Sequence, residues 1–536
     1  MPKLIVLLSG RVCAGKTTLA RRLGQTFADK YKLKHVKTFD FLKRLGDGIE
    51  LQRDTMQEFG ERLDRRSGGA WVCEELLREV QNHDEDAIVV LDSVRILGQI
   101  EAIRKAFGKR VIHIHLDARL TELEKRYKRR NNAEIKELAS YADVQRNKTE
   151  RNVPKLAKIA DVVILTDRCT EDDVLIRAAS HVGLFGREYL RLVDVVVGGQ
   201  FGSEGKGQIA SFLSREYELL VRVGGPNAGH TVYQEPDPYT FHHLPSGTNS
   251  SQAKLLIVAG AVLYVPTLMK EIAECQVDRE RLIIDPQAMI ITDADRRRET
   301  NLVANIGSTG QGVGQATARR VLRGKTVKLA KDIPELKPYI GEGLAVLEHA
   351  FAHRHRVLLE GTQGTGLSLY HGYYPHVTSR DTTVAGCLAE AGISPNRVQR
   401  VVMVCRTYPI RVQSPKGATS GEMSQEISWE EVAQRSRHDA VDLRSKELTS
   451  TTKRQRRVSE FDWALLRRAA TLNAPTDIAL TFVDYIAKAN EKARRFEQLT
   501  PDTIRFIEEV ERVAAAPVSL VSTRFHSRSI IDRRMW

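Results

Sequence analysis

The feature that most constrains this chain is a glycine-rich turn placed directly after a run of apolar residues. The run is KLIVLLSG, and the turn GRVCAGKTT holds Gly10, Gly15, Lys16 and Thr17 in the spacing G-x-x-x-x-G-K-T. A strand, such a loop and a helix together bind phosphate through backbone N–H groups and the helix N-terminus. The lysine supplies charge at the transferring phosphate, and the threonine hydroxyl holds Mg²⁺. The sequence therefore predicts a site for a nucleoside triphosphate.

Short runs rich in β-branched residues recur through residues 1–180, separated by stretches of helical length. The runs are KLIVLLSG, KHVKTFD, DAIVVLDS, KRVIHIHLD and ADVVILTD. This alternation predicts a doubly wound, parallel α/β sheet. At Val193 a new apolar run begins, and it has a glycine-rich turn of its own. We therefore expect two α/β units, residues 1–185 and residues 190–536.

Charged residues follow two of the predicted strands in the first unit. Asp40 follows the strand predicted in the second run, and Asp92 and Arg95 lie at the end of the third. With the arginine-bearing segment 119–130, which could form a lid helix, they resemble the phage-type deoxynucleoside monophosphate kinases. That resemblance implies phosphorylation of a (deoxy)nucleoside monophosphate. The alternatives are a strand-end acid that caps a turn, for Asp92, and a solvated helix face, for the lid arginines.

The second unit carries several motifs in a fixed order. They are GGQFGSEGKGQ, GGPNAGHTV, HHLPSG, AGAVLYVPTLMKE, IGSTGQGVG, LEGTQGTGLSLYHGYYPHVTSRDTT, TSTTKRQRRVSEFD and LTFVD. This ordered set resembles the adenylosuccinate synthetase family, in its shorter, archaeal-like branch. The resemblance implies an α/β domain that uses Mg²⁺ and ATP or GTP to ligate L-aspartate to C6 of a purine monophosphate.

Residue types in these motifs fit that chemistry. Lys206 lies between two glycines, where it neutralises a γ-phosphate that backbone N–H groups also approach. His230 follows a small turn, and an imidazole titrates near neutral pH, so it suits proton donation to O6. The alternative for His230 is a loop histidine with ordinary hydrogen bonds.

The resemblance also implies binding roles for loop residues, for which surface solvation is the alternative. It assigns the purine monophosphate to Asn227, Thr309, Arg323, Gln363, Thr378 and Arg454. It assigns aspartate to Thr451, Thr452, Arg454 and Arg456, the base of the triphosphate to Asp484 and Ser522, and the metal to the Gly229 carbonyl. Arg323 matches an arginine that reaches into the neighbouring subunit, which implies a homodimer with shared sites.

Ser203 departs from the family pattern, because an aspartate in that place removes the N1 proton and helps bind Mg²⁺. A hydroxyl is a poor base at neutral pH and a weak metal ligand. The unit could be an inactive nucleotide sensor, or it could process inosine monophosphate slowly through a water or another residue. The favoured interpretation is a guanine-type substrate, dGMP or GMP, whose 2-amino group donates to the serine oxygen. The spelling GSEGKG resembles phage enzymes that make 2-aminoadenylosuccinate from deoxyguanylate.

Two further departures leave the donor open between ATP and GTP. Phe482 stands where many family members have a lysine, and Arg524 stands where a glycine usually follows the base-contacting Ser-Thr pair. Both changes make GTP the less secure choice of donor.

Composition limits the remaining functional classes. The net charge is +14, but the basic residues are spread along the chain, which favours an enzyme of phosphorylated substrates over nucleic-acid binding. The 6 cysteines contain no C-x-x-C pair, and no apolar run reaches transmembrane length. We expect a cytoplasmic protein without a membrane partner.

Overall fold

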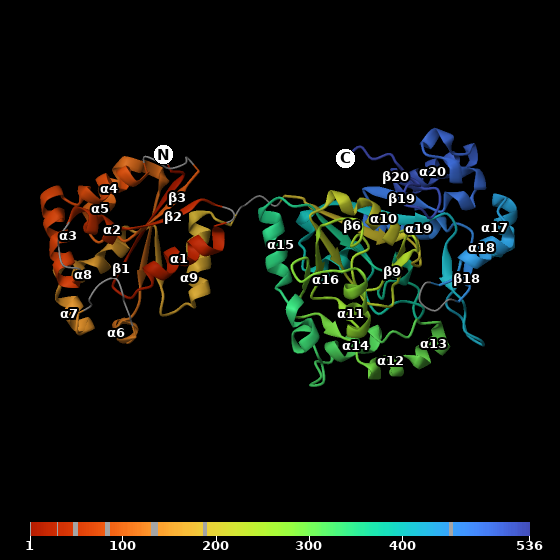
Figure 1. Ribbon diagram of the computed structural model, residues 1–536, viewed down its shortest axis with the longest axis horizontal. Coiled ribbons are helices and arrows are strands. Elements are labelled where there is room, and N and C mark those ends of the chain that lie inside the picture. The colour runs from red at the N-terminus through yellow and green to blue at the C-terminus, as the bar shows by residue number, and fades with distance from the viewer. Residues whose placement is uncertain are drawn as a thin grey trace. The chain divides into compact units, whose positions relative to one another are not determined.

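The apolar runs of the first 180 residues are all strands of one parallel sheet in the computed structural model (Figure 1). The structure describes residues 2–28, 31–46, 52–80, 86–129, 138–185, 190–449 and 454–536. The chain divides into two compact units, Met1–Glu188 and Tyr189–Trp536. No helix among the described residues is long and apolar enough to cross a membrane.

The sheet of the N-terminal unit has the order β2-β3-β1-β4-β5. Its strands are β1 (Leu4–Gly10), β2 (Leu33–Lys37), β3 (Ile88–Asp92), β4 (Val111–Asp117) and β5 (Val162–Leu165). Its helices are α1 (Lys16–Phe27), α2 (Thr38–Leu45), α3 (Arg53–Ser67), α4 (Ala70–Val80), α5 (Leu97–Phe107), α6 (Leu120–Lys128), α7 (Tyr141–Arg146), α8 (Lys148–Asn152) and α9 (Glu171–Val182).

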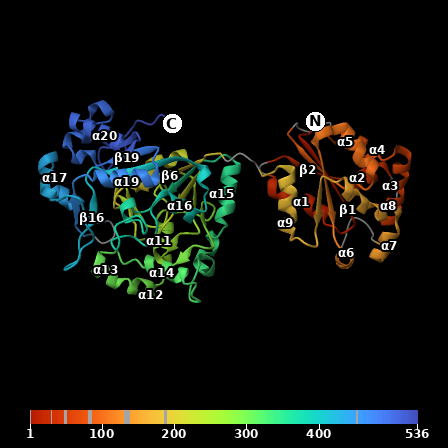
Figure 2. The ribbon, with the colours of Figure 1, turned by 180° about the vertical axis from the view of Figure 1, so that it is seen from behind.

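Helices cover both faces of this sheet, and its central strands β1 and β3 are accordingly buried along almost their whole length. One face packs on α1 and α9 through residues such as Leu23 and Ala178. The other packs on α4 and α5 through Leu76 and Ile103. Both ribbon views show α1 and α9 on one side of the sheet and α4 and α5 on the other (Figures 1 and 2).

The C-terminal unit is built on a larger sheet of order β12-β10-β7-β14-β6-β15-β19-β20-β21. All neighbouring pairs are parallel except β20 with β21. The strands are β6 (Val193–Gly198), β7 (Leu219–Arg222), β10 (Lys254–Ile257), β12 (Leu282–Ile284), β14 (Val357–Glu360), β15 (Val398–Arg406), β19 (Asp477–Thr481), β20 (Val518–Ser522) and β21 (Ile530–Asp532).

Small sheets and helices surround this core. The small sheets pair β8 (His230–Val232) with β9 (Tyr239–Phe241), β11 (Val262–Leu263) with β13 (Met289–Ile290), and β18 (Arg456–Ser459) with β16 (Ile410–Val412) and β17 (Glu426–Ile427). The helices are α10 (Lys206–Leu213), α11 (Val265–Glu274), α12 (Asp293–Arg298), α13 (Thr300–Ile306), α14 (Val313–Val321), α15 (Gly343–Ala352), α16 (Val384–Ala391), α17 (Trp429–Ser436), α18 (Ala440–Lys446), α19 (Trp463–Asn473) and α20 (Pro501–Ala514).

The topology gathers the chemically important loops of the C-terminal unit at one edge of its sheet. Strands β6, β7, β14, β15, β19 and β20 run parallel, and their carboxyl ends lead into the loops that carry the sequence motifs. In open parallel sheets, ligands bind outside this edge. The fold therefore indicates a ligand site at this edge. Separately, α12, α13 and α14 are grouped at one end of the unit (Figure 2).

Candidate active sites

The phosphate loop of the N-terminal unit depends on two glycines with positive φ. Gly10 has φ 139° and Gly15 has φ 99°. A Cβ on Gly10 would lie 2.0 Å from the Leu116 carbonyl oxygen of the neighbouring strand. Lys16 is the first residue of α1, and its Nζ donates to the carbonyl oxygens of Gly10 and Arg11 at 2.8 Å each. The loop thus holds a buried ammonium group at a helix N-terminus, where phosphate oxygens are favoured.

Thr17 and Asp92 lie together beside this loop. Thr17 Oγ1 donates to Asp92 Oδ2 at 2.6 Å, and Asp92 is the last residue of β3. Burial acts to raise the pKa of Asp92, but His35, Lys16 and Thr17 outweigh burial and lower it. An ionised carboxylate next to a hydroxyl is a donor set that suits Mg²⁺.

A cavity of about 900 Å³ lies beside the phosphate loop. Gly15, Lys16, Thr17, Asp92 and Arg95 all line it, so the structure brings these predicted residues together. Arg95 also forms an ion pair with the buried Glu150.

Other predicted groups of this unit are placed differently. Asp40 is exposed in the first turn of α2 and is not among the residues that line the cavity. The predicted lid segment contains α6, whose Arg126 lines the cavity and donates to Thr166 Oγ1 at 2.9 Å.

The C-terminal unit repeats the same construction with a different loop. β6 leads into Gly205 at φ 86°, and Lys206 is the first residue of α10. Lys206 is 3% exposed, and its Nζ lies 2.5 Å from Glu204 Oε2. Glu204 also accepts hydrogen bonds from the backbone N–H groups of Gln200 and Gly202 at 3.1 and 2.8 Å. The carboxylate therefore holds both the loop and the lysine in place.

His230 lies against the start of α10. A Cβ on Gly207 would be 2.8 Å from the His230 Cβ, so only glycine allows this approach. His230 Nδ1 is hydrogen-bonded to Glu360 Oε1, at the end of β14. Glu360 Oε2 accepts from the Ser246 N–H at 2.7 Å, and Oε1 lies 3.3 Å from Arg222 Nη1.

The surroundings of His230 and Glu360 determine which of the two side chains is charged. Burial and the charge of Arg222 lower the pKa of His230 from the ordinary histidine value of 6.5 to about 4. Burial acts to raise the pKa of Glu360, but Arg222, His230 and Ser246 lower it to about 2. Without a nucleotide, a neutral His230 therefore faces an ionised Glu360, and an anion bound nearby would favour the imidazolium.

Two amide side chains, those of Asn227 and Gln363, have buried polar atoms without hydrogen-bond partners among the described residues. Asn227 Nδ2 lies 3.2 Å from Thr378 Oγ1, which joins two predicted nucleotide-binding residues. Gln363 is 8% exposed at φ 58°, and neither of its side-chain polar atoms has a partner among the described residues. Asn227 Oδ1 is also buried without a described partner. Buried polar groups normally find partners, so these atoms are available to a bound polar molecule.

A second cavity, of about 620 Å³, brings together two other predicted residues. Thr309 and Arg454 both line it, and Arg296 and Lys416 add two further cationic side chains. A hydroxyl among three cationic groups suits a phosphate monoester.

Ser203 is exposed, with φ 55°, and its carbonyl oxygen lies 3.4 Å from Arg406 Nη1. Arg406 is completely buried and pairs with Glu447 at 2.9 Å. Glu447 also binds Arg456 Nη1 at 3.0 Å and Tyr485 Oη at 2.6 Å. Burial acts to raise the pKa of Glu447, but Arg406 and Arg456 lower it to about 2. The network fixes Arg456 next to the loop that carries Ser203.

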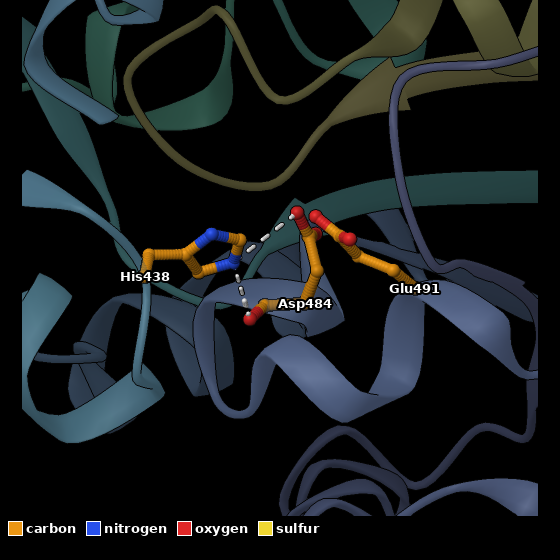
Figure 3. Close-up of side chains that lie close together, drawn as sticks. All are labelled: His438, Asp484 and Glu491. Carbon is orange, nitrogen blue, oxygen red and sulfur yellow. Dashed lines mark hydrogen bonds and ion pairs between the residues drawn. The ribbon is translucent and has the colours of Figure 1, made fainter. Parts of the chain in front are cut away.

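Asp484 lies between His438 and Glu491 (Figure 3). His438 Nε2 is 3.1 Å from the Asp484 carbonyl oxygen and 3.9 Å from Oδ2, whereas Oδ1 is buried without a described partner. Burial, assisted by Glu491 and Glu447, raises the pKa of Asp484 to about 8. Ser522 ends β20, the strand beside β19, and its hydroxyl donates to the Arg524 carbonyl oxygen at 3.3 Å.

The remaining predicted site residues are Arg323, Gly229, Thr451 and Thr452. Arg323 is exposed beyond the end of α14, at φ 53°. Gly229 is half-buried and immediately precedes His230. Thr451 and Thr452 lie outside the described residues.

Sequence reasoning missed Glu360, Arg406 and Glu447. Glu360 and Arg406 are the last residues of β14 and β15, and each directly follows a run of buried apolar residues. A charged residue ending such a strand is the signal that could have identified both. Glu447 carries no such signal, because it does not end a strand and its partners Arg406 and Tyr485 come from other parts of the chain.

Comparisons with known proteins agree with this arrangement. The family model described as adenylosuccinate synthetase matches residues 195–332 and 324–491. The adenylosuccinate synthetase of Methanocaldococcus jannaschii is 40% identical over 349 residues, which are 63% of this chain and 96% of that protein. The enzyme of Archaeoglobus fulgidus is 38% identical over 349 residues, covering 63% and 98%.

Two solved structures share the fold. The fully ligated adenylosuccinate synthetase of Plasmodium falciparum has a TM-score of 0.57 at 20% identity, covering 64% of this chain and 100% of that one. The succinoaminodeoxyadenylate synthetase of cyanophage S-2L, bound to dGMP and dATP, has a TM-score of 0.55 at 25% identity, covering 65% and 96%. Through its C-terminal unit, the chain belongs to the adenylosuccinate synthetase family.

Proposed function

We propose that the C-terminal unit ligates L-aspartate to C6 of a guanine-type monophosphate, dGMP or GMP, at the expense of a nucleoside triphosphate. The N-terminal unit phosphorylates a (deoxy)nucleoside monophosphate. Family membership supports the ligation, and the phosphate loop with its cavity supports the phosphoryl transfer.

The ligation proceeds in two steps. The purine loses its N1 proton, O6 attacks the γ-phosphorus, and the nucleoside diphosphate leaves. The aspartate amine then attacks C6, the C6–O6 bond breaks, and inorganic phosphate departs. Lys206 neutralises the γ-phosphate, and His230, supported by Glu360, donates a proton towards O6. Arg454 and Arg456 bind carboxylate or phosphate oxygens, which a guanidinium group suits.

The observation that carries the choice of purine is Ser203. Its side chain is small, neutral and exposed, so it offers an acceptor and space to a 2-amino group. The cyanophage protein that shares the fold is bound to dGMP. No carboxylate stands at position 203 to take the N1 proton, and a water or another residue must do so.

The donor is best matched by an adenine nucleotide. A neutral carboxylic acid both donates and accepts, which complements adenine N1 and the 6-amino group, whereas guanine offers two donors to an ionised carboxylate. The raised pKa of Asp484 keeps its carboxyl neutral at neutral pH. Phe482 in place of a lysine supports the same choice.

Mg²⁺ would be held in the N-terminal unit by Thr17 and Asp92, whose oxygens fit it. In the C-terminal unit, the Gly229 carbonyl oxygen is a further neutral donor. The ion supplies neutralisation of phosphate charge. We also propose a homodimer in which the exposed Arg323 contacts the monophosphate of the partner subunit.

The test is a reaction of the purified chain with Mg²⁺, aspartate, ATP or GTP, and dGMP, GMP or IMP, followed by mass analysis. We expect a mass gain matching succinylation of dGMP or GMP with ATP. Sedimentation with and without nucleotide reports the dimer. Consumption of no triphosphate with any purine would leave a nucleotide sensor instead.

A second candidate substrate is IMP. It is favoured by the 40% identity to the adenylosuccinate synthetase of M. jannaschii, a higher identity than that to the cyanophage protein. Succinylation of IMP in preference to dGMP and GMP would establish this alternative.

A further inference from the structure

The proposed kinase activity leaves one wall of the N-terminal cavity without a role. This wall is a face of α3, on which Arg53, Gln57, Glu61 and Asp64 recur at intervals of four, four and three residues. Such spacing places side chains on one face of a helix. All four residues line the cavity that also contains the phosphate loop. This face is therefore in a position to contact a phosphoryl acceptor bound in the cavity.

Asp64 is committed to the structure of the wall. Its Oδ1 accepts from Trp71 Nε1 at 2.7 Å and from Gln99 Nε2 at 2.9 Å. These bonds tie α3 to α4 and α5. The neighbouring residues of this face, Glu61 and Gln57, remain for contacts with an acceptor.

Glu61 is held in a fixed orientation by two donors. Its Oε1 accepts from Asn147 Nδ2 and from Thr149 Oγ1, at 2.9 Å each. Oε2 has no partner among the described residues, and Glu61 is half-buried where it lines the cavity. An ionised carboxylate only accepts hydrogen bonds, so Glu61 selects a ligand that presents N–H groups.

Gln57 lies one helical turn from Glu61 and supplies the opposite polarity. Its Nε2 is buried and has no hydrogen-bond partner among the described residues. A buried amide N–H without an acceptor is unfavourable, so a ligand oxygen at this place is stabilising. The face of α3 thus presents a donor and, one turn away, an acceptor.

We propose that the N-terminal unit phosphorylates a guanine-type monophosphate, GMP or dGMP, whose base edge is read by Gln57 and Glu61. Guanine presents O6 as an acceptor, followed by the N1–H and 2-amino donors, and adenine presents the reverse order at N6 and N1. Gln57 donates to O6, and Glu61 accepts from N1–H and the 2-amino group. The buried Arg53 and the cavity-lining Arg95 face the 5′-phosphate.

The inference rests on the proposed kinase function. An oxygen of the acceptor's phosphate forms a bond to the γ-phosphorus of ATP, the β,γ bridging P–O bond breaks, and ADP leaves. Both units would then handle the same base class: one would use it as the substrate for ligation and the other as the substrate for phosphorylation.

The experiment uses the full chain without aspartate, so that the ligase cannot turn over. ATP, Mg²⁺ and one isotopically labelled monophosphate are supplied, and the labelled nucleoside diphosphate is identified by chromatography against an authentic standard, because an O6-phosphorylated monophosphate would have the same mass. The acceptors are GMP, dGMP, IMP, AMP and CMP. We expect kcat/KM for GMP or dGMP to exceed that for IMP at least 10-fold, because IMP lacks the 2-amino group, and that for AMP about 100-fold.

Two variants and one control localise the effect. Glu61→Gln should reduce the preference for GMP over IMP to less than 3-fold, and Gln57→Glu should raise the relative rate with AMP. Glu58→Gln changes an exposed carboxylate on α3 that does not line the cavity, and it should behave like the natural chain. Melting-temperature shifts with GMP confirm that each variant is folded.

Equal kcat/KM for GMP and IMP, or a preference for AMP, would overturn the guanine inference. Efficient transfer to CMP alone would also overturn it, while the kinase function would stand. Transfer to none of the acceptors would remove both.

Discussion

At the scale of single residues, the backbone around position 203 matters as much as its side chain. Ser203 has φ 55°, in the left-handed region where aspartate and asparagine are the best tolerated of the non-glycine residues. An aspartate therefore fits the conformation that the serine now has. The absence of a carboxylate is then a matter of chemistry rather than of backbone geometry.

Ser203→Asp should shift the ligase towards IMP. The added carboxylate offers a base for N1–H and occupies the space of the 2-amino group, so we expect the ratio of kcat/KM for IMP to that for dGMP to rise at least 10-fold. Steady-state assays with both purines measure this ratio. Ser203→Asn matches the size without the charge and should lower the dGMP rate without helping IMP. A ratio that is unchanged in the aspartate variant would remove Ser203 from specificity.

Asp484→Asn should flatten the pH dependence of stability of the C-terminal unit. The folded pKa of about 8 is above the ordinary value of 3.8, so between these values the folded state binds the proton that the unfolded state has lost. This group's contribution to the free energy of unfolding therefore falls as pH rises from about 4 to about 8. Asparagine removes that contribution.

The measurement is chemical denaturation at several pH values between 5 and 9, following the C-terminal transition. The control is Asp237→Asn, which neutralises an exposed aspartate and should leave the slope unchanged. The free energy of unfolding could instead change with pH equally in the Asp484 variant and in the natural chain. The Asp484 carboxyl would then already be ionised in the folded state, and it would no longer favour an adenine donor.

At the scale of elements, the sequence predicted the strands better than the groups between them. The central runs of the N-terminal sheet are recognisable because buried parallel strands need nearly continuous apolar residues, as in β1 and β3. The loop lysines are recognisable because glycine must precede them. The pairing of His230 with Glu360 was not predictable, since 130 residues separate them and only the order of strands in the sheet brings them together.

Asp40 is a residue that the sequence suggested for the site but that does not line the cavity. The sequence placed it after a strand, where parallel sheets collect functional groups, but α2 begins at Thr38 and exposes its side chain. The helix phase, rather than the position after the strand, decides where the carboxylate points.

Gly15→Ala tests the strand–loop–helix element. Gly15 has φ 99° as the N-cap of α1, and an alanine there should cost about 1–2 kcal/mol of stability and lower phosphoryl transfer at least 10-fold. Gly183→Ala is the matched control, because Gly183 caps α9 at φ 76° with nothing within 4 Å of a new Cβ, as is also true of Gly15. Denaturation and kinase assays should show a similar stability loss but unchanged kcat in the control. Equal activity losses would mean that the loop has no special role.

At the scale of the whole molecule, the two units share one way of placing a lysine at the N-terminus of a helix. Each places a glycine with positive φ after a central strand and makes a lysine the first residue of the next helix. Each lysine is buried and held by groups of its own unit, carbonyl oxygens for Lys16 and Glu204 for Lys206. The two glycine-lysine loops were therefore predictable from short sequence motifs, whereas the choice of substrate depends on contacts made only after folding.

Because each site is built within its own unit, the two activities should be separable by single substitutions. Lys16→Ala removes the ammonium group from the kinase loop and should lower transfer to the monophosphate at least 100-fold, while ligation with aspartate keeps its kcat. Lys206→Ala should do the reverse, with the added effect that Glu204 loses its buried partner, so some loss of stability in the C-terminal unit is expected. Parallel assays of diphosphate formation and of succinylated product measure both outcomes in each variant. If Lys16→Ala also abolished ligation, the ligase would depend on a phosphorylated product of the kinase unit, and the independence of the two sites would be refuted.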